Sequence, residues 1–311
     1  MRDCRQVASA IEEMRIRGAP LIGVAAAYGL ALTAHHSKAR STKELMKRIE
    51  ASADTLRNTR PTGANLFWAV DRILKKAKES SGSVGSVAKA VVDEAQKMAD
   101  EDAQTNKRIG ENGSELIQDG DTILTHCNAG ALATVEYGTA LGIIRTAWVQ
   151  NKKIKVYVTE TRPRLQGARL TTYELKREGI PVTLVTDNAV GYLMSKRLVG
   201  KVVVGADRVV RDAVINKIGT YTIAVLAHEH GIPFYVAAPT SSFDLRRTSA
   251  DVVIEERGMG EVTHFGSERI APSGVRALNP AFDVTPLKYV SSIICERGVL
   301  TVKEFQELAK K

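Results

Sequence analysis

Residues 201–207, KVVVGAD, form a short run of β-branched residues that ends in a glycine and an aspartate. A continuous apolar run of this length predicts a strand buried on both faces of a parallel sheet. Six similar runs follow residue 121, and helical stretches separate most of them. They are TILTH (122–126), KVYVT (155–159), PVTLVT (181–186), PFYVAA (233–238), DVVIEE (251–256) and YVSSIIC (289–295). The alternation predicts an α/β fold with a parallel sheet and helices on both of its faces.

The first part of the chain has a different pattern and is predicted to be helical. An amphipathic run through Ile11, Met14 and Ile16 is followed by an apolar helix over PLIGVAAAYGLALTA (20–34), which should be buried. Three more helices are expected over 42–56, 65–77 and 87–116, separated by Pro61, Gly63 and GSVGS (82–86). We therefore expect two domains, a helical N-terminal one at 1–117 and a sheet-containing one at 118–311.

Composition excludes several classes of protein. With 44% hydrophobic and 25% charged residues over 311 positions, the chain is neither disordered nor fibrous. Its three cysteines, Cys4, Cys127 and Cys295, lie far apart, unlike those of a zinc site or a secreted disulfide scaffold, which favours the reducing cytoplasm. The longest apolar stretch, 20–34, is shorter than the roughly 20 residues that span a bilayer, so no membrane partner is expected.

The net charge of +9 indicates an anionic partner. Residues 1–80 hold 15 Lys and Arg against 8 Asp and Glu, so +7 of the total lies in the helical part. These charges are scattered and only 5% of residues are aromatic, which disfavours nucleic acid and favours a small anionic molecule. No GxGxxG follows a strand, and neither GxxxxGK[ST] nor HExxH occurs. A dinucleotide enzyme, a P-loop ATPase and a zinc protease are therefore disfavoured.

Ligands of open parallel sheets bind beyond the carboxyl ends of the strands, so the residues after each strand are the first candidates for function. Cys127 follows the run at 122–126 and precedes a Gly- and Ala-rich turn predicted to open a helix. Backbone N–H groups there would favour a thiolate or bind an anion. The alternative is a small buried hydrophobic residue, the usual role of a free cysteine.

Asp207 ends the run at 201–207, where desolvation could let its carboxyl group hold a proton at neutral pH. The alternative is a helix cap or an ion pair with Arg208 or Arg211.

Three other segments carry side chains suited to an anion. Asn216 and Lys217 stand where a helix is predicted to start, and RGAP (17–20) and RPTG (60–63) are arginine-bearing turns whose small residues allow a ligand to come close. Arginine binds phosphate through two nitrogens at once. The alternative for Asn216 and Lys217 is a solvated helix end. Taken singly, each arginine turn would more often be an ion pair at a helix end.

Several motifs together resemble the family of methylthioribose-1-phosphate isomerases. They are RGAPLIGVAAAYGLAL (17–32), RPTGANLFWAV (60–70), THCNAGALAT (125–134), YGTALGIIR (137–145), ETRPRLQGARLTTYEL (160–175), VGADRV (204–209), NKIGTY (216–221), APTSSFD (238–244) and NPAFDVTP (279–286). The Cys127 loop, the RPT turn, LQGARLT and NKIGTY are specific to this branch of a wider group. That group also holds ribose-1,5-bisphosphate isomerases and regulatory subunits of translation initiation factor 2B.

The resemblance implies a helical N-terminal domain on a Rossmann-like C-terminal domain, a homodimer, and no metal or nucleotide cofactor. It implies that the aldose 5-methylthioribose 1-phosphate is isomerised to the ketose 5-methylthioribulose 1-phosphate in methionine salvage. Asp207 would be the proton donor and Cys127 the second catalytic residue. The residues that would hold the substrate and its phosphate are Arg17, Gly18, Ala19, Arg60, Gln166, Asn216 and Lys217.

Two features depart from the family pattern. Family members usually carry a few dozen more residues before the RGAP motif, whereas residues 1–16 precede it here, and this bears on how the cleft closes. Glu136 stands where a small residue is expected. At the start of a helix behind Cys127, its charge would either oppose a thiolate or complement the helix dipole.

The sequence leaves alternatives open. The substrate could instead be ribose 1,5-bisphosphate or 5-deoxyribose 1-phosphate, which differ from the methylthio sugar in the substituent at C5. A second phosphate there would need another basic cluster, whereas a methylthio group would need an apolar pocket. The chain could also be a non-catalytic regulatory subunit that binds protein or RNA. For an isomerase, ring opening by a protonated Asp207 could be followed by hydride migration from C2 to C1, or by an enediol route with Cys127 as the base.

Overall fold

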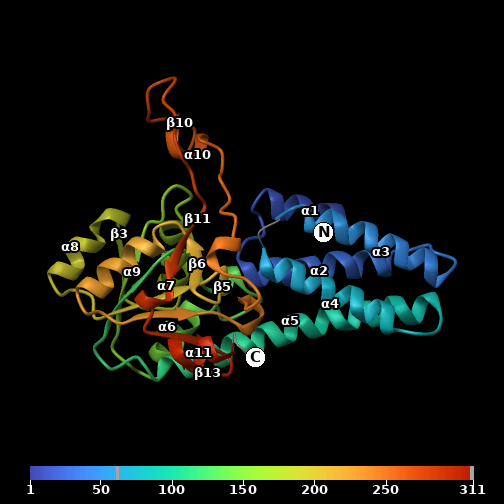
Figure 1. The fold of residues 1–311 in the computed structure, drawn as a ribbon, viewed down its shortest axis with the longest axis horizontal. Coiled ribbons are helices and arrows are strands. Elements are labelled where there is room, and N and C mark those ends of the chain that lie inside the picture. Colours follow the sequence, from blue (N-terminus) through green and yellow to red (C-terminus); the bar gives the residue numbers. More distant parts are fainter. Residues whose placement is uncertain (61–62, 309–311) are drawn as a thin grey trace.

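The computed structural model describes residues 1–60 and 63–308, so Pro61 and Thr62 of the RPTG turn lie outside the described residues. Within these ranges the first elements are the helices α1 (Cys4–Glu12), α2 (Ala19–His35), α3 (Thr42–Arg57), α4 (Ala64–Glu79) and α5 (Val84–Ser114). They form the bundle at one end of the molecule (Figure 1). The helix α2 packs against the other four, which explains why its sequence is apolar on every side.

Local sequence signals set the ends of these helices. The side chains of Asp3, Ser41 and Ser83 each accept a hydrogen bond from a backbone N–H in the first turn of the helix that follows. The helices predicted over 20–34, 42–56, 65–77 and 87–116 are confirmed to within three residues. The amphipathic run at the start is only partly helical, because α1 ends at Glu12 and Met14 has a φ of 59°.

The main sheet has seven strands in the order β13-β12-β7-β4-β1-β2-β3. Only β13, at one edge, runs antiparallel to its neighbour among the strands of this sheet that the structure describes. The strands are β1 (Thr122–Thr125), β2 (Lys155–Thr159), β3 (Val182–Val185), β4 (Lys201–Gly205), β7 (Phe234–Ala237), β12 (Ser292–Cys295) and β13 (Gly298–Thr301). The predicted α/β fold with a helical N-terminal part and a parallel, Rossmann-like sheet is confirmed.

Helices cover both faces of this sheet, as the apolar strands predict. Val202 and Val204 of β4 lie in one hydrophobic core, whereas Val203 between them lies in another, because successive side chains of a strand point to opposite faces. The first core includes residues of α8 (Val190–Ser195), α9 (Thr220–Glu229) and α11 (Val302–Leu308). The second includes residues of α5, α6 (Ala140–Val149) and α7 (Thr172–Arg177).

The strand order identifies where a ligand would bind. The chain winds outward from β1 through β2 to β3, then returns to β4 on the other side of β1 and winds the opposite way. Ligands of doubly wound sheets bind at such a switch point, beyond the carboxyl ends of the two central strands. Cys127 follows β1 and Asp207 follows β4, so the fold brings these two segments side by side.

A second sheet, β11-β6-β5-β8, lies next to this edge. Its strands are β5 (Arg208–Val210), β6 (Ala213–Lys217), β8 (Phe243–Asp244) and β11 (Phe282–Pro286). The prediction that a helix starts at Asn216 and Lys217 is wrong, because these residues end β6 and pair with β11. The helix α9 begins three residues later, after Gly219.

The prediction of a strand at 251–256 is also wrong, because the structure describes these residues and they form no strand. Val252 and Ile254 alternate as in a strand and pack against the core of the second sheet, but backbone pairing there is limited to a bridge between Glu256 and Pro280. The chain then forms a projecting arm with α10 (Gly260–Thr263) and the hairpin β9 (His264–Phe265) and β10 (Glu268–Arg269) (Figure 1).

The helix α5 connects the two parts of the molecule, since it packs against α2 at one end and α6 at the other. Gly110 and Gly113 make the contact between α5 and α6 possible. A Cβ at Gly110 would lie 2.6 Å from Thr146 Oγ1, and one at Gly113 would lie 2.4 Å from Ile143 Cδ1. We propose a domain boundary at 117/118, between α5 and β1. No helix within 1–60 or 63–308 combines the length and apolarity needed to cross a membrane.

Asp102, on α5, accepts hydrogen bonds from the Val135 N–H (2.8 Å) and from Asn106 Nδ2 (3.0 Å). Burial penalises the charged carboxylate and raises its pKa from 3.8 to about 6. A carboxyl group whose pKa is raised by folding stabilises the fold while it is protonated. That contribution is fully present below pH 3.8 and is lost as the pH rises through 6.

Asp102→Asn should therefore be more stable than the wild type at pH 7.5, by roughly 3 kcal/mol, with about half of that gain remaining at pH 5. Urea unfolding at the two pH values measures this. Asp93→Asn, at an exposed position of the same helix, is the control and should show no such trend. A gain from Asp102→Asn that does not change with pH would contradict the assignment.

Candidate active site

A cavity lies beyond the carboxyl ends of β1 and β4, at the switch point of the sheet. It is lined by segments of the helical bundle, both sheets and the loop after β2. The structure brings all nine predicted site residues to its wall: Arg17, Gly18, Ala19, Arg60, Cys127, Gln166, Asp207, Asn216 and Lys217. Five stretches of chain, at 17–19, 60, 127, 166 and 207–217, therefore meet at one place.

Cys127 is held by its backbone. Its N–H donates to Thr161 Oγ1 (3.0 Å) and its carbonyl oxygen accepts from Thr171 Oγ1 (2.6 Å). These two bonds fix a φ of 61°, which is unusual for a residue other than glycine and is typical of functional sites.

The environment of the Cys127 thiol differs from the prediction. A three-residue 3₁₀ turn, Ala131–Ala133, follows it, and α6 begins only at Ala140, so the turn after Cys127 does not open an α-helix. Burial raises the pKa of the thiol, while the positive charges of Arg17 and Lys217 lower it. The cavity therefore favours a neutral thiol, and cationic neighbours oppose that preference.

Asp207 lies in the cavity wall, with its N–H donating to the carbonyl oxygen of Ile215 in β6 (3.0 Å). Burial raises the pKa of its carboxyl group, while the charges of Lys217, Arg60 and Arg17 lower it. Burial also lowers the pKa of Lys217, whose Nζ donates to the Ala281 carbonyl oxygen (2.7 Å). A carboxyl group that can stay protonated thus lies among cations.

The N-terminus of α2 also faces the cavity. Gly18 is its N-cap with a φ of 96°, and no side chain caps the first turn, so its N–H groups are available to an anion. A Cβ at Gly18 would lie 2.4 Å from the Ala133 carbonyl oxygen. Only glycine permits this close contact between the bundle and the Cys127 loop. Arg17 precedes it and adds a guanidinium group.

Gln166 and Asn216 supply amide groups to the same wall. Gln166 is 6% exposed and its Oε1 has no hydrogen-bond partner, so it is available to a hydroxyl group of a ligand. It is followed by a π-helical turn at Gly167–Thr171, a distortion that is frequent at functional sites. Asn216 is oriented by its Nδ2, which donates to Thr220 Oγ1 (3.0 Å).

The part of the chain that the structure describes holds no group of three or more His, Cys, Asp or Glu side chains that could bind a metal ion. The cavity instead presents arginine, lysine and amide groups with one carboxyl group and one thiol. This set suits an anionic, hydroxylated molecule and acid–base chemistry on it.

Comparison with known proteins agrees with this arrangement. The pattern of the initiation factor 2 subunit family matches residues 15–302. The chain belongs to the initiation factor 2 subunit family. Methylthioribose-1-phosphate isomerase from Thermosipho africanus is 52% identical over 309 residues, which cover 99% of this chain and 89% of the relative. The resemblance expected from the motifs is confirmed.

Solved structures of this family superimpose closely. The crystal structure of 5-methylthioribose 1-phosphate isomerase from Pyrococcus horikoshii has a TM-score of 0.89 and 46% identity, covering 99% of this chain and 87% of that one. A crystal structure described as the delta subunit of translation initiation factor eIF-2B from A. fulgidus has a TM-score of 0.87 and 49% identity, covering 100% and 92%. Proteins that this chain resembles are thus named both as an isomerase and as a translation factor subunit.

Sequence reasoning missed several residues of the site. His126, buried, donates from Nε2 to the Ile218 carbonyl oxygen (2.8 Å), and its Nδ1 accepts from Thr159 Oγ1 (2.6 Å). Burial lowers the pKa of this imidazole, so it stays neutral and fixes the loop after β6. Its place at the carboxyl end of the predicted strand at 122–126 was the available signal. Asn128 and Phe282 also line the cavity.

Glu136 does not have the expected position. It is exposed in the bend before α6, four residues ahead of the helix start at Ala140. The charges that act on the pKa of Cys127 come from Arg17, Lys217 and Asp207.

Gly18→Ala should lower the free energy of unfolding by about 2–4 kcal/mol and weaken ligand binding, since the added Cβ clashes with Ala133 and the φ of 96° is strained. Urea unfolding measures the first effect. Gly200→Ala is the control: its Cβ would lie 3.6 Å from the nearest atom and its φ is outside the left-handed range. Equal losses in the two variants would show that the contact with Ala133 is unimportant.

Proposed function

We propose that this protein converts 5-methylthioribose 1-phosphate into 5-methylthioribulose 1-phosphate, an aldose–ketose isomerisation of methionine salvage. The observation that carries the proposal is the convergence of all nine motif residues on one cavity, in a chain about half identical to methylthioribose-1-phosphate isomerases. A regulatory subunit without catalytic activity would have no need for a carboxyl group and a thiol desolvated in one cavity.

The chemistry of the substrate calls for an acid. Its anomeric oxygen is esterified to phosphate, so the ring cannot open to a free aldehyde, and the ring oxygen must receive a proton. Asp207 is the proton donor in this proposal, because burial raises the pKa of its carboxyl group and so favours the protonated form. Cys127 is the second catalytic residue, on the adjacent strand end.

The phosphate group accounts for the cations. Arg17, Arg60 and Lys217 line the cavity with the uncapped N-terminus of α2. Each charge-assisted hydrogen bond to a phosphate contributes about 1.5–3 kcal/mol. Gln166 Oε1, which has no partner, accepts from a sugar hydroxyl group. We assign substrate binding to these residues together with Gly18, Ala19 and Asn216, without a metal or nucleotide cofactor.

An apolar pocket adjoins the cavity and favours the methylthio group. It shares Ala19, Arg60, Asp207 and Phe282 with the cavity. Its remaining wall is mainly aliphatic, and the charge of Arg208, which also lines it, is paired with Asp244 (3.3 Å). The aliphatic side chains are Ile22, Leu66, Ile215, Val252, Val253 and Ile254. A methylthio substituent at C5 would be desolvated there, whereas a second phosphate would not be stabilised.

A second candidate substrate, ribose 1,5-bisphosphate, is favoured by another neighbouring pocket. This one shares Arg17 and Gln166 with the cavity and adds Arg15, Arg164 and Arg169. Two of these added charges already have partners, since Arg15 pairs with Glu13 (2.8 Å) and Arg164 with Glu261 (2.6 Å). The apolar pocket is therefore the better guide to the C5 substituent.

We further propose a cytoplasmic homodimer that binds no nucleic acid. The projecting arm presents large apolar side chains to solvent, and contiguous exposed apolar surface usually belongs to an interface. These side chains are Met259, Phe265, Ile270, Val275 and Leu278, each about half exposed or more. Cys4, Cys127 and Cys295 are all free, as in proteins of a reducing compartment.

The pure protein should form ketose from 5-methylthioribose 1-phosphate at least 100-fold more efficiently than from ribose 1,5-bisphosphate, because burying an unpaired phosphate in the apolar pocket is costly. Ketose formation with each sugar measures kcat/KM. A preference for the bisphosphate would move the C5 group to the arginine-rich pocket, and no ketose from any pentose 1-phosphate would overturn the isomerase function.

Cys127→Ala and Asp207→Asn should each lose nearly all turnover, by about 10²–10⁴-fold in kcat as for other acid–base residues, while keeping the fold. Ketose formation and thermal unfolding measure the two properties. Cys295→Ala, a buried cysteine of β12 outside the cavity, is the control for loss of a buried thiol and should retain activity. Near-normal turnover in either site variant would remove that residue from the mechanism.

A further inference from the structure

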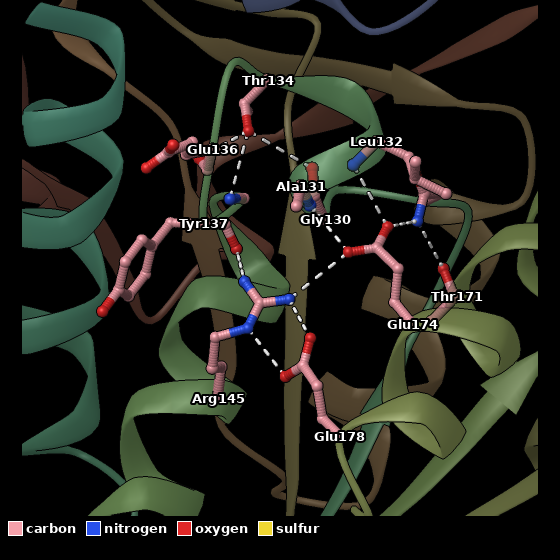
Figure 2. A network of polar contacts seen from close by, with 12 residues as sticks. Gly130, Ala131, Leu132, Thr134, Glu136, Tyr137, Arg145, Thr171, Glu174 and Glu178 are labelled. Carbon is pink, nitrogen blue, oxygen red and sulfur yellow. Dashed lines mark hydrogen bonds and ion pairs between the residues drawn. The ribbon is translucent and has the colours of Figure 1, made fainter. Parts of the chain in front are cut away.

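A network of polar contacts behind the cavity centres on Glu174, a residue of α7 that is 5% exposed. One carboxylate oxygen, Oε2, accepts from the Ala131 N–H (2.8 Å) and pairs with Arg145 Nη2 (3.5 Å). The other, Oε1, accepts from the Leu132 N–H (3.3 Å) and from Asn128 Nδ2 (2.9 Å). Figure 2 shows the carboxylate group pointing into the turn at 130–132. The loop after Cys127 is thus wrapped around one buried carboxylate.

The backbone of this loop is shaped to admit the carboxylate group. A Cβ on Gly130 would lie 2.4 Å from both oxygens of Glu174, so only glycine leaves room for them. Gly138 forms a bridge with Gly130, and a Cβ there would lie 2.4 Å from Gly130 Cα. Two glycines are needed to bring the turn onto Glu174.

Glu174 also decides how the Asn128 side chain is oriented. A carboxylate only accepts hydrogen bonds, so the Nδ2 group of Asn128 must face it, and Nδ2 donates to Thr171 Oγ1 (3.2 Å) as well. The amide oxygen is left to point the other way. There, Oδ1 accepts from Arg17 Nη1, and the Asn128 carbonyl oxygen accepts from Nη2 (2.9 Å).

Arg17 is therefore held by two oxygens whose direction is set from behind the cavity. If the carboxylate lost its acceptor character, the Asn128 amide could turn over and present Nδ2 to the guanidinium group. Two donors would then face each other, and Arg17 would lose its orientation in the cavity. Arg145 completes the network from the far side, where it also pairs with Glu178 (Figure 2).

We propose that Glu174 is a positioning residue, which fixes the loop after Cys127 and, through Asn128, aims the guanidinium group of Arg17 at the phosphate of the substrate. The proposal rests on the proposed isomerase function for the identity of the substrate. It adds a residue that touches no reacting atom and lies outside the cavity lining.

Glu174→Gln tests this with Glu178→Gln as the matched control, because both changes remove a carboxylate that pairs with Arg145 and only the first reaches Asn128. Glu174→Gln should raise KM for 5-methylthioribose 1-phosphate and Kd for inorganic phosphate by about 10- to 100-fold, the worth of one charge-assisted contact. Glu178→Gln should change both less than about threefold. Equal effects of the two variants would overturn the proposal.

A double-mutant cycle with Arg17→Ala separates positioning from a general structural role. If Glu174 acts through Arg17, Glu174→Gln should weaken phosphate binding less than about twofold in the Arg17→Ala background. Fully multiplicative losses would mean that Glu174 does not act through Arg17. Asn128→Ala keeps the Glu174 carboxylate but removes the side chain that connects it to Arg17. This variant should show the same loss of phosphate affinity and the same coupling to Arg17. Wild-type affinity in Asn128→Ala would overturn the proposal.

The phosphate titration needs no turnover, so the two proposals fail separately. Absence of ketose formation by the wild type would overturn the isomerase function, whereas the relative affinities of the variants for inorganic phosphate would still decide the role of Glu174.

Discussion

Desolvation of a carboxyl group, a thiol and an ammonium group in one cavity is the constraint on which the site depends. Burial drives each of Asp207, Cys127 and Lys217 towards its neutral form, while the attraction of the Lys217 ammonium group for the other two favours the charged forms. Because these two effects oppose each other, the carboxyl group of Asp207 can hold its proton although cationic side chains line the same cavity. Such a balance requires fixed positions, because charge interactions in a poorly solvated site change steeply with distance. The surrounding scaffold supplies that rigidity.

Much of the fold follows from the sequence because the main sheet is buried on both faces. Strands such as β2 and β4 are short, continuous β-branched runs, and this pattern has few other structural solutions. The location of the site could also be predicted, since its motifs stand directly after these strands. The strand order then places the ends of β1 and β4 together, so residues 80 positions apart, such as Cys127 and Asp207, come to line one cavity.

The wrong predictions of secondary structure have a common physical origin. A local sequence pattern does not specify which distant segment the backbone of a residue will hydrogen-bond to. Residues 251–256 alternate like a strand, yet their apolar side chains are buried against the second sheet without a ladder of backbone bonds. Lys217 looked like a helix start because the helix is only three residues away, while its backbone is held by β11 from far along the chain. Glu174 resembles an ordinary surface glutamate of a helix. Its burial results from a loop more than 40 residues earlier, which no local signal reveals.

The helix α5 has a consequence for how this chain reaches its native state. Its first half belongs to the bundle, but its last turns, at Ile109, Gly110 and Gly113, are complementary to α6. During synthesis these turns leave the ribosome some 30 residues ahead of α6, so an apolar stripe of a finished helix faces water until Ala140–Val149 follows. The contact between the bundle and the second part of the molecule can therefore form only after α6 has been synthesised, although the contacts among α1–α5 need no later residue.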